Sequence, residues 1–316
     1  MIRKSMPDSH YSIGVDLGGT NLRAAAISRA GQLLSKVSGA TEFELGRDEV
    51  IQDMVNAVGQ LREKHGHKNL AGIGIGVPGF IDLEKGVIVG THNLLGFDQY
   101  PIRDELSARL ETPVILENDA NAAAQGEKWM GAGRDVNDLV LLTLGTGIGG
   151  GIISQGRVLH GFVGMAGELG HMTVIPGGNI CGCGNYGCLE KHASATAVEA
   201  MAKLVALGDN LTAKQVFELA EKGNRNAQRI FEQMGSALGI ALATLINIFN
   251  FPLYLLSGGV LPAWKYFAPK MLAEIESRSF TYRNTKTRIE PATLGNEAGL
   301  YGAAYLPFLL QQISRS

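Results

Sequence analysis

One pattern occurs twice along the chain and constrains the fold more than any other feature: strand, glycine turn, strand, second turn, third strand. The first two strands are expected at Tyr11–Asp16 and Asn21–Ser28 in one copy and at Leu139–Leu144 and Gly150–Ser154 in the other. Segments with helical apolar spacing, such as Asp48–His65, follow each copy. A duplicated hairpin core of this kind predicts an α/β protein built from two similar halves.

Length and composition narrow the class of protein. A chain of 316 residues exceeds the size at which a single core stops growing, about 250 to 300 residues, so two domains are expected. The formal net charge is −2 and basic residues are scattered, which argues against nucleic acid as a partner. No apolar run reaches the length of about 18 residues that a membrane span needs. The polar opening stretch Met1–His10 lacks the apolar region of a signal peptide.

All three cysteines lie in one short stretch, preceded by a histidine within loop reach: His171, Cys181, Cys183 and Cys188. Three thiolates and one imidazole complete a four-coordinate zinc shell with no position open for water, so we expect a structural metal. Two other interpretations stay open: three unrelated thiols, or a redox pair of Cys181 and Cys183. Cysteines grouped as metal ligands fit a reducing cytoplasm better than a disulfide framework, so a cytoplasmic protein is expected.

The residues around this cluster resemble a known family. Gly167–His171 has the form G-E-x-G-H, and Cys181–Glu190 has the form C-x-C-G-x-x-G-C-x-E. Both are similar to the signature of the ROK family of sugar kinases and repressors, and the resemblance runs from about Ile13 to Ala304. It implies an actin-like ATPase fold with ribonuclease-H-like halves, in which two α/β domains surround a cleft and a zinc-braced loop is present.

The expected domains follow from this resemblance and from the repeated pattern. A small domain is expected over residues 1–118, completed by the C-terminal helix over about residues 297–316. A large domain is expected over residues 119–296 and contains the zinc loop 171–188.

Two glycine turns are expected to bind nucleotide. Gly145–Gly150 satisfies the dinucleotide pattern G-x-G-x-x-G, but that fingerprint requires a helix after the glycines, and Gly151–Ser154 is a short β-branched segment. We therefore predict a hairpin whose amides and Thr146 hydroxyl approach phosphate oxygens, with an ordinary hairpin turn as the alternative. Asp16, at a strand end, is suited to hold a Mg²⁺–water cluster. The predicted ATP-binding residues are Asp16, Gly18, Gly19, Thr20, Gly145, Thr146, Gly147, Gly258 and Gly259, the last two because they match the family's adenosine-side turn.

Glu117–Asn121 is expected as a loop between a strand and an Ala-rich helix. On its own, this position favours a helix cap, with Asp119 or Asn118 as the capping residue. The same segment matches the E-N-D-A-N motif of the ROK family, which implies that Asp119 is the general base that accepts the proton of the sugar hydroxyl. The implied sugar site consists of Pro78, Gly79, Asn118, Asp119, Glu168, His171 and Glu190.

The resemblance implies an ATP-dependent hexose kinase, most similar to the family's glucokinases, with Mg²⁺ as a cofactor and a structural Zn²⁺. Another hexose (mannose, fructose or an N-acetylhexosamine) and polyphosphate as the phosphoryl donor stay open. A sugar-sensing regulator of the same family would carry a helix-turn-helix before the first strand, where Met1–His10 is too short for one, so an enzyme is expected. The expected partners are a small-molecule hexose and further copies of the chain in a homodimer or homotetramer, with no nucleic acid and no membrane.

Overall fold

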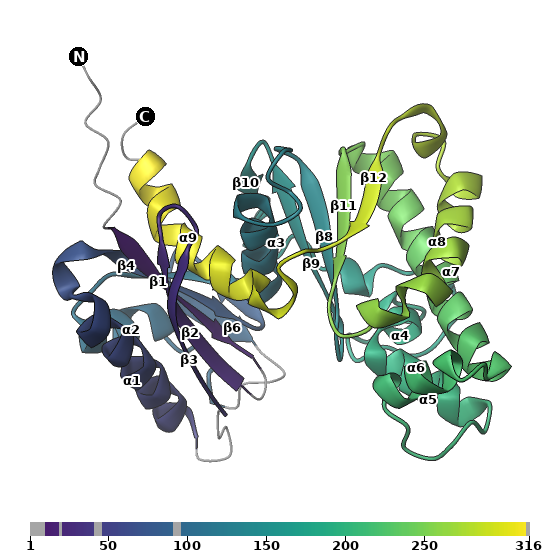
Figure 1. Cartoon of the computed structure of the whole chain (residues 1–316), viewed down its shortest axis with the longest axis horizontal. Coiled ribbons are helices and arrows are strands. Elements are labelled where there is room, and N and C mark those ends of the chain that lie inside the picture. The colour runs from purple at the N-terminus through teal and green to yellow at the C-terminus, as the bar shows by residue number, and fades with distance from the viewer. Residues whose placement is uncertain (1–9, 19–20, 41–45, 91–95, 314–316) are drawn as a thin grey trace. The chain divides into compact units, whose positions relative to one another are not determined.

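The computed structural model (Figure 1) describes residues 10–18, 21–40, 46–90 and 96–313. The chain divides into two compact units. Unit 1 comprises Met1–Asn137, Gly151–Ala166 and Asn296–Ser316, and unit 2 comprises Asp138–Gly150 and Gly167–Gly295. Residues 119–137 and 151–166 thus group with unit 1, whereas the sequence-based division assigned them to the large domain. As a division into domains, the boundary at residue 118 stays a prediction.

Unit 1 is built on a five-stranded sheet with the strand order β3-β2-β1-β4-β7. The strands are β1 (Tyr11–Leu17), β2 (Asn21–Ser28), β3 (Leu33–Ala40), β4 (Leu70–Val77) and β7 (Val114–Asn118). β1, β2 and β3 pair antiparallel, while β1, β4 and β7 run parallel. Every residue of β1 is buried, as expected for a strand that is covered on both faces. A separate two-stranded sheet consists of β5 (Phe80–Asp82) and β6 (Val87–Gly90).

Helices cover both faces of the five-stranded sheet. The helices of this unit are α1 (Arg47–His65), α2 (Ile102–Leu110), α3 (Asp119–Trp129) and α9 (Ala298–Ile313). On one face, Met54 of α1 shares a core cluster with Val15 of β1. Neighbouring strand residues point to opposite faces, and at Gly14 a Cβ would lie 2.3 Å from the carbonyl oxygen of Leu300 in α9. The close contact between α9 and the sheet therefore requires a residue without a side chain at Gly14.

The second sheet repeats the topology of the first, because its order β10-β9-β8-β11-β12 matches β3-β2-β1-β4-β7 position by position. Its strands are β8 (Leu139–Leu144), β9 (Ile148–Ser154), β10 (Arg157–Val158), β11 (Leu253–Ser257) and β12 (Arg288–Pro291). β9 and β10 pair antiparallel, and β8, β11 and β12 run parallel. The duplicated hairpin core predicted from the sequence is confirmed.

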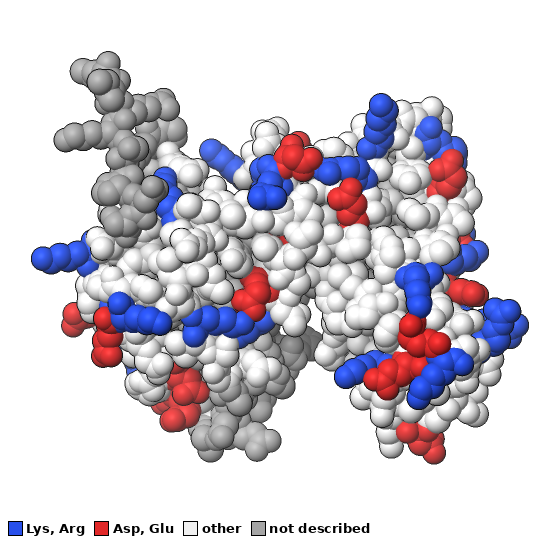
Figure 2. All heavy atoms as spheres, in the orientation of Figure 1, with Lys and Arg blue, Asp and Glu red and all other residues white. Residues whose placement is uncertain are grey.

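The helices of unit 2 are α4 (Glu190–Ala193), α5 (Ala195–Leu204), α6 (Ala213–Glu221), α7 (Arg225–Phe249) and α8 (Trp264–Arg278). Short 3₁₀ turns occur along the chain at His67–Asn69, Leu169–His171, Leu261–Ala263, Tyr282–Asn284 and Gly295–Glu297. Among the described helices, α7 alone has the length and composition of a membrane span, but 67% of its apolar window is buried inside the protein. Burial of this kind is typical of a core helix. On the face drawn in Figure 2, acidic and basic side chains are interspersed, in line with the net charge of −2.

The segment Glu117–Asn121, expected as a loop, contains the end of β7 and the start of α3. No connecting loop is needed because Asn118 caps the helix, and its side chain accepts from the backbone N–H groups of Ala120 and Asn121. Asp119 then lies in the first helical turn, as in one of the two alternatives considered from the sequence.

Five helices and strands were not expected from the sequence: β5, β6, β12, α4 and α8. The three strands have 3, 4 and 4 residues, which is too few for a clear alternation of apolar and polar side chains. In α8, Pro269 lies inside the helix, where proline normally argues against helical structure.

Candidate functional site

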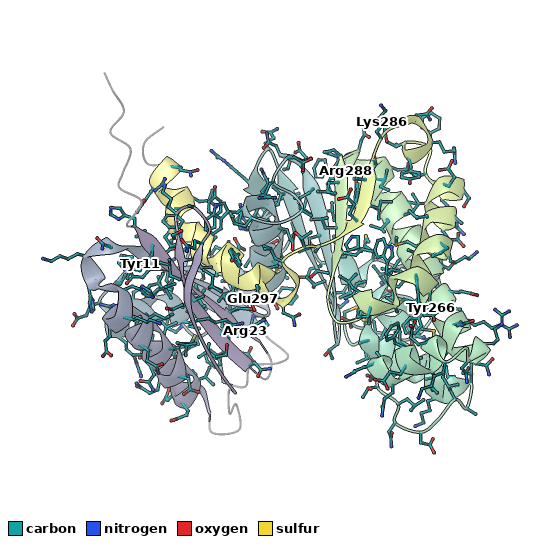
Figure 3. All side chains as sticks on the ribbon, in the orientation of Figure 1. Tyr11, Arg23, Tyr266, Lys286, Arg288 and Glu297 are labelled. Atoms are coloured by element: carbon teal, nitrogen blue, oxygen red, sulfur yellow. The ribbon has the colours of Figure 1, made fainter. Side chains whose placement is uncertain are left out.

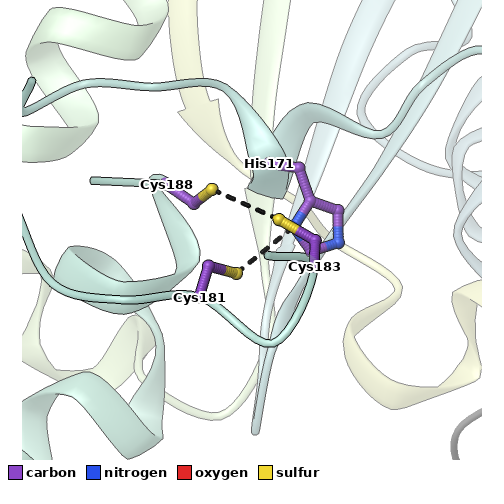
Figure 4. A group of neighbouring side chains, drawn as sticks. All are labelled: His171, Cys181, Cys183 and Cys188. Atoms are coloured by element: carbon purple, nitrogen blue, oxygen red, sulfur yellow. Dashed lines mark hydrogen bonds between the residues drawn. The ribbon is translucent and has the colours of Figure 1, made fainter. Parts of the chain in front are cut away.

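The four predicted zinc ligands come together in unit 2 (Figure 4). One donor atom from each of His171, Cys181, Cys183 and Cys188 lies within 4.8 Å of the others. His171 Nδ1 is 3.6 Å from Cys181 Sγ, and Cys183 Sγ is 3.7 Å from Cys188 Sγ. A tetrahedral zinc, with Zn–S of about 2.3 Å and Zn–N of about 2.0 Å, places two sulfurs about 3.8 Å apart and a sulfur and a nitrogen about 3.5 Å apart. The donor set and both distances therefore fit zinc.

The thiols of this cluster also fit a cation by their chemistry. All three cysteines are free, so they form no disulfide with one another. Burial raises the pKa of Cys188 to about 12, whereas the backbone N–H of Asn185 lowers the pKa of Cys183. A thiol with so high a pKa becomes a thiolate at neutral pH only where a metal stabilises it.

The imidazole of His171 faces two groups at once. Its Nδ1 faces the thiol cluster, and its Nε2 lies 3.9 Å from Glu168 Oε2. Burial is the largest cause of the raised pKa of Glu168, to which Glu190 also contributes. At Gly170 a Cβ would lie 2.1 Å from the Ile148 carbonyl oxygen, so glycine lets this segment pack onto β9. His171 can therefore donate one nitrogen to a metal and keep the other for a ligand beside Glu168.

Glu190 lies against the second glycine turn, at the start of α4. Its Oε2 accepts a hydrogen bond of 3.1 Å from the backbone N–H of Ile148. At Gly147 a Cβ would lie 2.3 Å from the same oxygen. Glu190 follows Cys188 by two residues, so its bond to Ile148 connects the loop 171–188, which contains the four predicted zinc ligands, to the glycine turn. Sequence reasoning missed this contact, which joins residues 42 positions apart and leaves no local signal.

The second glycine turn is held by the start of α5. The backbone N–H of Ala195 donates to the Gly145 carbonyl at 2.8 Å, and the Thr196 hydroxyl donates to the Thr146 carbonyl at 2.8 Å. Both carbonyls are thus occupied by donors and are kept from facing a bound anion. The turn continues into strand β9 and not into a helix, so it lacks the element that a dinucleotide fingerprint requires.

The two glycines after β11 differ in their surroundings. Gly258 has a φ of 110°, and a Cβ there would lie 2.2 Å from the Leu144 carbonyl oxygen, so close backbone packing alone requires glycine. A Cβ at Gly259 would meet nothing within 4 Å. Open space at Gly259 suits approach by a ligand.

In unit 1, Asp16 is buried and paired across the first hairpin with Arg23. Arg23 donates to Asp16 Oδ2 at 2.5 Å and to the Asn296 carbonyl at 2.5 Å, and Figure 3 labels Arg23 beside Glu297. Burial raises the pKa of Asp16 above its usual range even though Arg23 acts to lower it, and Glu297 raises it further. A carboxylate whose charge is only partly compensated in this way fits a second cation such as Mg²⁺.

The residues around Asp16 were only partly foreseen from the sequence. Asp16 and Arg23 are cross-strand partners, so a pair of opposite charges that flank a short turn was the available signal. The backbone N–H of Gly18 donates to the Asn21 carbonyl at 2.9 Å and closes the turn. The predicted phosphate ligands Gly19 and Thr20 lie outside the described residues.

Three of the predicted sugar-site residues form a connected group in unit 1. Asn118 Nδ2 donates to the Gly79 carbonyl at 3.2 Å, and Asn118 Oδ1 accepts from the Ala120 N–H at 2.9 Å. Asp119 Oδ1 accepts from the same N–H at 2.8 Å. Gly79 has a φ of 103°, which only glycine adopts readily, and it follows Pro78 directly after β4. The helix start therefore fixes the Asp119 carboxylate beside Asn118 and Gly79.

Glu117, a buried acid that was not predicted to have a role, forms hydrogen bonds with residues of this group and of the first turn of α3. Glu117 accepts from the Asn118 backbone N–H at 3.0 Å and from Asn121 Nδ2 at 3.2 Å. Its other oxygen lies 2.7 Å from His160 Nε2, and the hydrogen bond to Glu117 raises the pKa of His160. Glu117 thus links the end of β7, the first turn of α3 and His160. His160 is 43 residues away and could not be identified from local sequence.

Comparison with known proteins identifies the family. Residues 12–308 match the family model described as "ROK family". The glucokinase of Halalkalibacterium halodurans is 38% identical, over 95% of this chain and 96% of the relative. The ROK hexokinase structure from Thermus thermophilus is 36% identical with a TM-score of 0.85, and it covers 96% of this chain and 99% of its own. A ROK family glucokinase from Streptomyces griseus, in complex with glucose and AMPPNP, is 32% identical with a TM-score of 0.78, over 94% of this chain and 98% of its own. The chain belongs to the ROK family.

Proposed function

We propose that this protein transfers the γ-phosphoryl group of ATP to a hydroxyl of glucose, forming glucose 6-phosphate. The observation that carries the proposal is the group of Gly79, Asn118 and Asp119, which holds a carboxylate and an amide at one helix start. The similarity to a glucokinase at 38% identity and to a glucokinase structure that contains glucose and AMPPNP supports the choice of substrate and donor.

In the proposed reaction, a sugar hydroxyl oxygen forms a bond to the γ-phosphorus, and the bond from this phosphorus to the bridging oxygen breaks to release ADP. The hydroxyl proton passes to the Asp119 carboxylate. Anchoring of this carboxylate by the Ala120 N–H fixes it for proton transfer, and positioning is the main contribution in phosphoryl transfer. Asn118 is proposed to bond the sugar hydroxyls next to the reacting one.

The two glycine turns are proposed to bind ATP. Asp16 is the proposed carboxylate of a Mg²⁺ site, where the metal would neutralise phosphate charge. Gly18, Gly19 and Thr20 in unit 1, and Gly145, Thr146 and Gly147 in unit 2, are proposed phosphate ligands, with Gly258 and Gly259 on the adenosine side. The occupied carbonyls of Gly145 and Thr146 support this role.

For the sugar, Glu168, His171 and Glu190 are proposed to bond hydroxyls, and Pro78 and Gly79 to shape the pocket. Zinc bound by His171, Cys181, Cys183 and Cys188 would fix the imidazole that faces Glu168. The finer assignments are proposals as well: glucose in preference to other hexoses, a cytoplasmic location, and a homodimer or homotetramer.

A coupled assay tests the function. The enzyme is given glucose, mannose, fructose and N-acetylglucosamine with ATP, and glucose with polyphosphate. We expect glucose with ATP to give the highest kcat/KM. A higher value for another hexose would overturn the proposed substrate, and a lack of turnover with every pair would overturn the kinase itself.

Asp119→Asn tests the base. The amide keeps the size of the side chain but accepts no proton, so kcat is expected to fall at least about 10²-fold with little change in glucose affinity. The matched control is Asp48→Asn, which alters an exposed aspartate in the first turn of α1 and should have normal activity. Near-normal turnover in folded Asp119→Asn would exclude Asp119 as the base.

A further inference from the structure

A cavity lies within unit 1, and none of its lining residues is proposed above to bind sugar or ATP. Its volume is about 920 Å³, and its walls are β7, α3, β10 and the second half of α9. In Figure 1, α3 lies beside α9 and close to β10. The volume is typical of a small-molecule site.

The inner wall of this cavity is apolar and aromatic. Leu116 comes from β7, Trp129 from α3, and Tyr305 and Leu306 from α9. The rings of Trp129 and Tyr305 are stacked, with centroids 4.7 Å apart and planes at 20°. Such a wall favours the apolar body of a ligand, because aromatic faces bury a large area.

The outer wall of the cavity carries basic side chains that have no role in the proposed kinase reaction. Lys128, Arg134 and Arg157 line the cavity, and none of them has an ion pair or hydrogen-bond acceptor in the part of the chain that the structure describes. The acid among the lining residues, Glu117, is already bonded to His160. The net charge of this wall is therefore positive, which favours an anion.

A buried amide between these walls lacks a partner. Gln125 of α3 is fully buried and lines the cavity, yet neither its Oε1 nor its Nε2 has a hydrogen-bond partner among the described residues. Buried side-chain polar atoms almost always have one. The amide therefore calls for a polar group from an occupant of the cavity, which a purely apolar covering surface would not supply.

We propose that this cavity binds an amphipathic organic anion: a carboxylate on an apolar body that carries a hydroxyl or carbonyl group. The apolar body lies against Trp129 and Tyr305, and the carboxylate lies between Arg134 and Arg157. The polar group of the body bonds the Gln125 amide. This assignment rests on the cavity alone and stands or falls independently of the sugar kinase reaction.

The experiment uses Trp129 as a reporter. The chain has two tryptophans, so Trp264→Phe leaves Trp129 as the sole fluorophore of this kind. The probe is 8-bromooctanoate, whose bromine quenches indole fluorescence at short range. We expect saturable quenching, with affinity about tenfold weaker for the neutral analogue 8-bromooctan-1-ol, because two exposed charge pairs together contribute about that much.

Two charge-neutralising variants in the Trp264→Phe background locate the carboxylate. The double variant Arg134→Gln/Arg157→Gln should bind 8-bromooctanoate about tenfold more weakly and should lose the preference for the acid over the alcohol. The matched control, Arg225→Gln/Arg229→Gln, removes the same charge from exposed positions of α7 and should bind both probes as the parent protein does.

A competition experiment tests the role of Gln125. We expect 8-hydroxyoctanoate to displace the probe about fivefold more strongly than octanoate, since its hydroxyl can bond the buried amide. Equal displacement would overturn the assignment of Gln125 as a ligand contact.

Three results would overturn the site as a whole: no saturable quenching, equal affinity for acid and alcohol in the parent protein, or equal weakening in both double variants. A second copy of the chain is the alternative occupant of the cavity. Sedimentation at each protein concentration used for the quenching measurements determines whether the protein is a monomer or an oligomer. Quenching that appears only on dilution to monomers would assign this face to a second copy of the chain and would also overturn the proposal.

Discussion

The two glycine turns occupy equivalent positions in two sheets of the same topology, but each obtains its carboxylate in a different way. In unit 1 the acid belongs to the hairpin itself, since Asp16 lies in β1 and pairs with Arg23 across the strands. At the second turn, neither of the flanking strands β8 and β9 contains an acid. The carboxylate at that turn comes from Glu190, 42 residues after Ile148, to which it is bonded.

This difference assigns the turns different chemistry on the same backbone. Asp16 is buried, and Arg23 compensates its negative charge only in part, which suits a carboxylate that binds a cation. Glu190 is bonded to the turn and lies two residues beyond a cysteine of the metal cluster, so it connects the turn to the braced loop. Topology thus determines where a turn lies, while the side chains that reach it determine what it does.

The largest effect is expected from removing the in-strand acid of the first turn. Asp16→Asn keeps the size of the side chain but cannot hold Mg²⁺ as a carboxylate does. We expect kcat/KM for Mg²⁺-ATP to fall about 10² to 10³-fold, the range for loss of one strong electrostatic contact in a reacting site. Calorimetry should give unchanged glucose affinity. If glucose affinity fell in parallel, Asp16 would be a structural residue, and the contrast between the turns would disappear.

Loss of the metal should affect the second turn indirectly. Chelation, or Cys181→Ser, frees the loop that positions His171 and Glu190, so the KM for glucose should rise about 10 to 100-fold. Because Glu190 also bonds Ile148, the KM for ATP should rise too, but less. Metal analysis should find one zinc per chain. Added zinc should restore the chelated protein and leave Cys181→Ser impaired, and a zinc-free protein with normal KM values would refute the connection.

Gly147→Ala tests the contact between Glu190 and the turn with a single methyl group. A Cβ at this position would lie 2.3 Å from Glu190 Oε2, and Gly147 does not have a left-handed φ, so displacement of the carboxylate is the expected cause of any defect. We expect the KM values for glucose and ATP to rise together by roughly tenfold, the lower end of the range for displaced supporting groups. The control is Gly59→Ala in α1, where a Cβ meets nothing within 4 Å. Unchanged KM values would mean that the turn tolerates movement of Glu190.

Local patterns were sufficient to predict the duplicated hairpins and the grouping of His171 with the three cysteines, and they identified Asn118 as one of two candidate caps. Each of these depends on residues close in sequence: alternating strands around glycines, cysteines within a few residues, and an amide just before a helix. The contacts that give the site its electrostatics are different. Glu190 with Ile148 and Glu117 with His160 join residues 42 and 43 positions apart, so only the folded chain brings them together.

The cavity in unit 1 illustrates the same limit. Gln125 and Trp129 lie on a helix whose apolar spacing indicates only a packed face, and nothing local marks an unpartnered amide. The Gln125 amide has no hydrogen-bond partner among the described residues because of the way α9 and β10 pack against α3. Burial and partner geometry are properties of the tertiary structure, which single-sequence patterns do not carry.

The smallest expected effect is on the free energy of unfolding, whose dependence on pH should differ between variants of the first turn and of the second turn. The pKa of Asp16 is raised in the folded state, so the folded protein binds this proton more tightly than the unfolded chain does. Stability should therefore fall as the pH rises from about 3.9, the ordinary aspartate value, through the raised pKa. Asp16→Asn has no such titration, so at neutral pH without Mg²⁺ it should be more stable than the parent, by on the order of 1 kcal/mol, as is common for a stabilising substitution. In the second turn, Glu190→Gln keeps an oxygen acceptor for the Ile148 N–H and should change the free energy of unfolding less.

Urea unfolding of the parent protein, Asp16→Asn and Glu190→Gln between about pH 3 and pH 8 measures both effects. Lower stability of Asp16→Asn at neutral pH would mean that the pairing with Arg23 outweighs the cost of burial, and that the first turn is balanced without a metal.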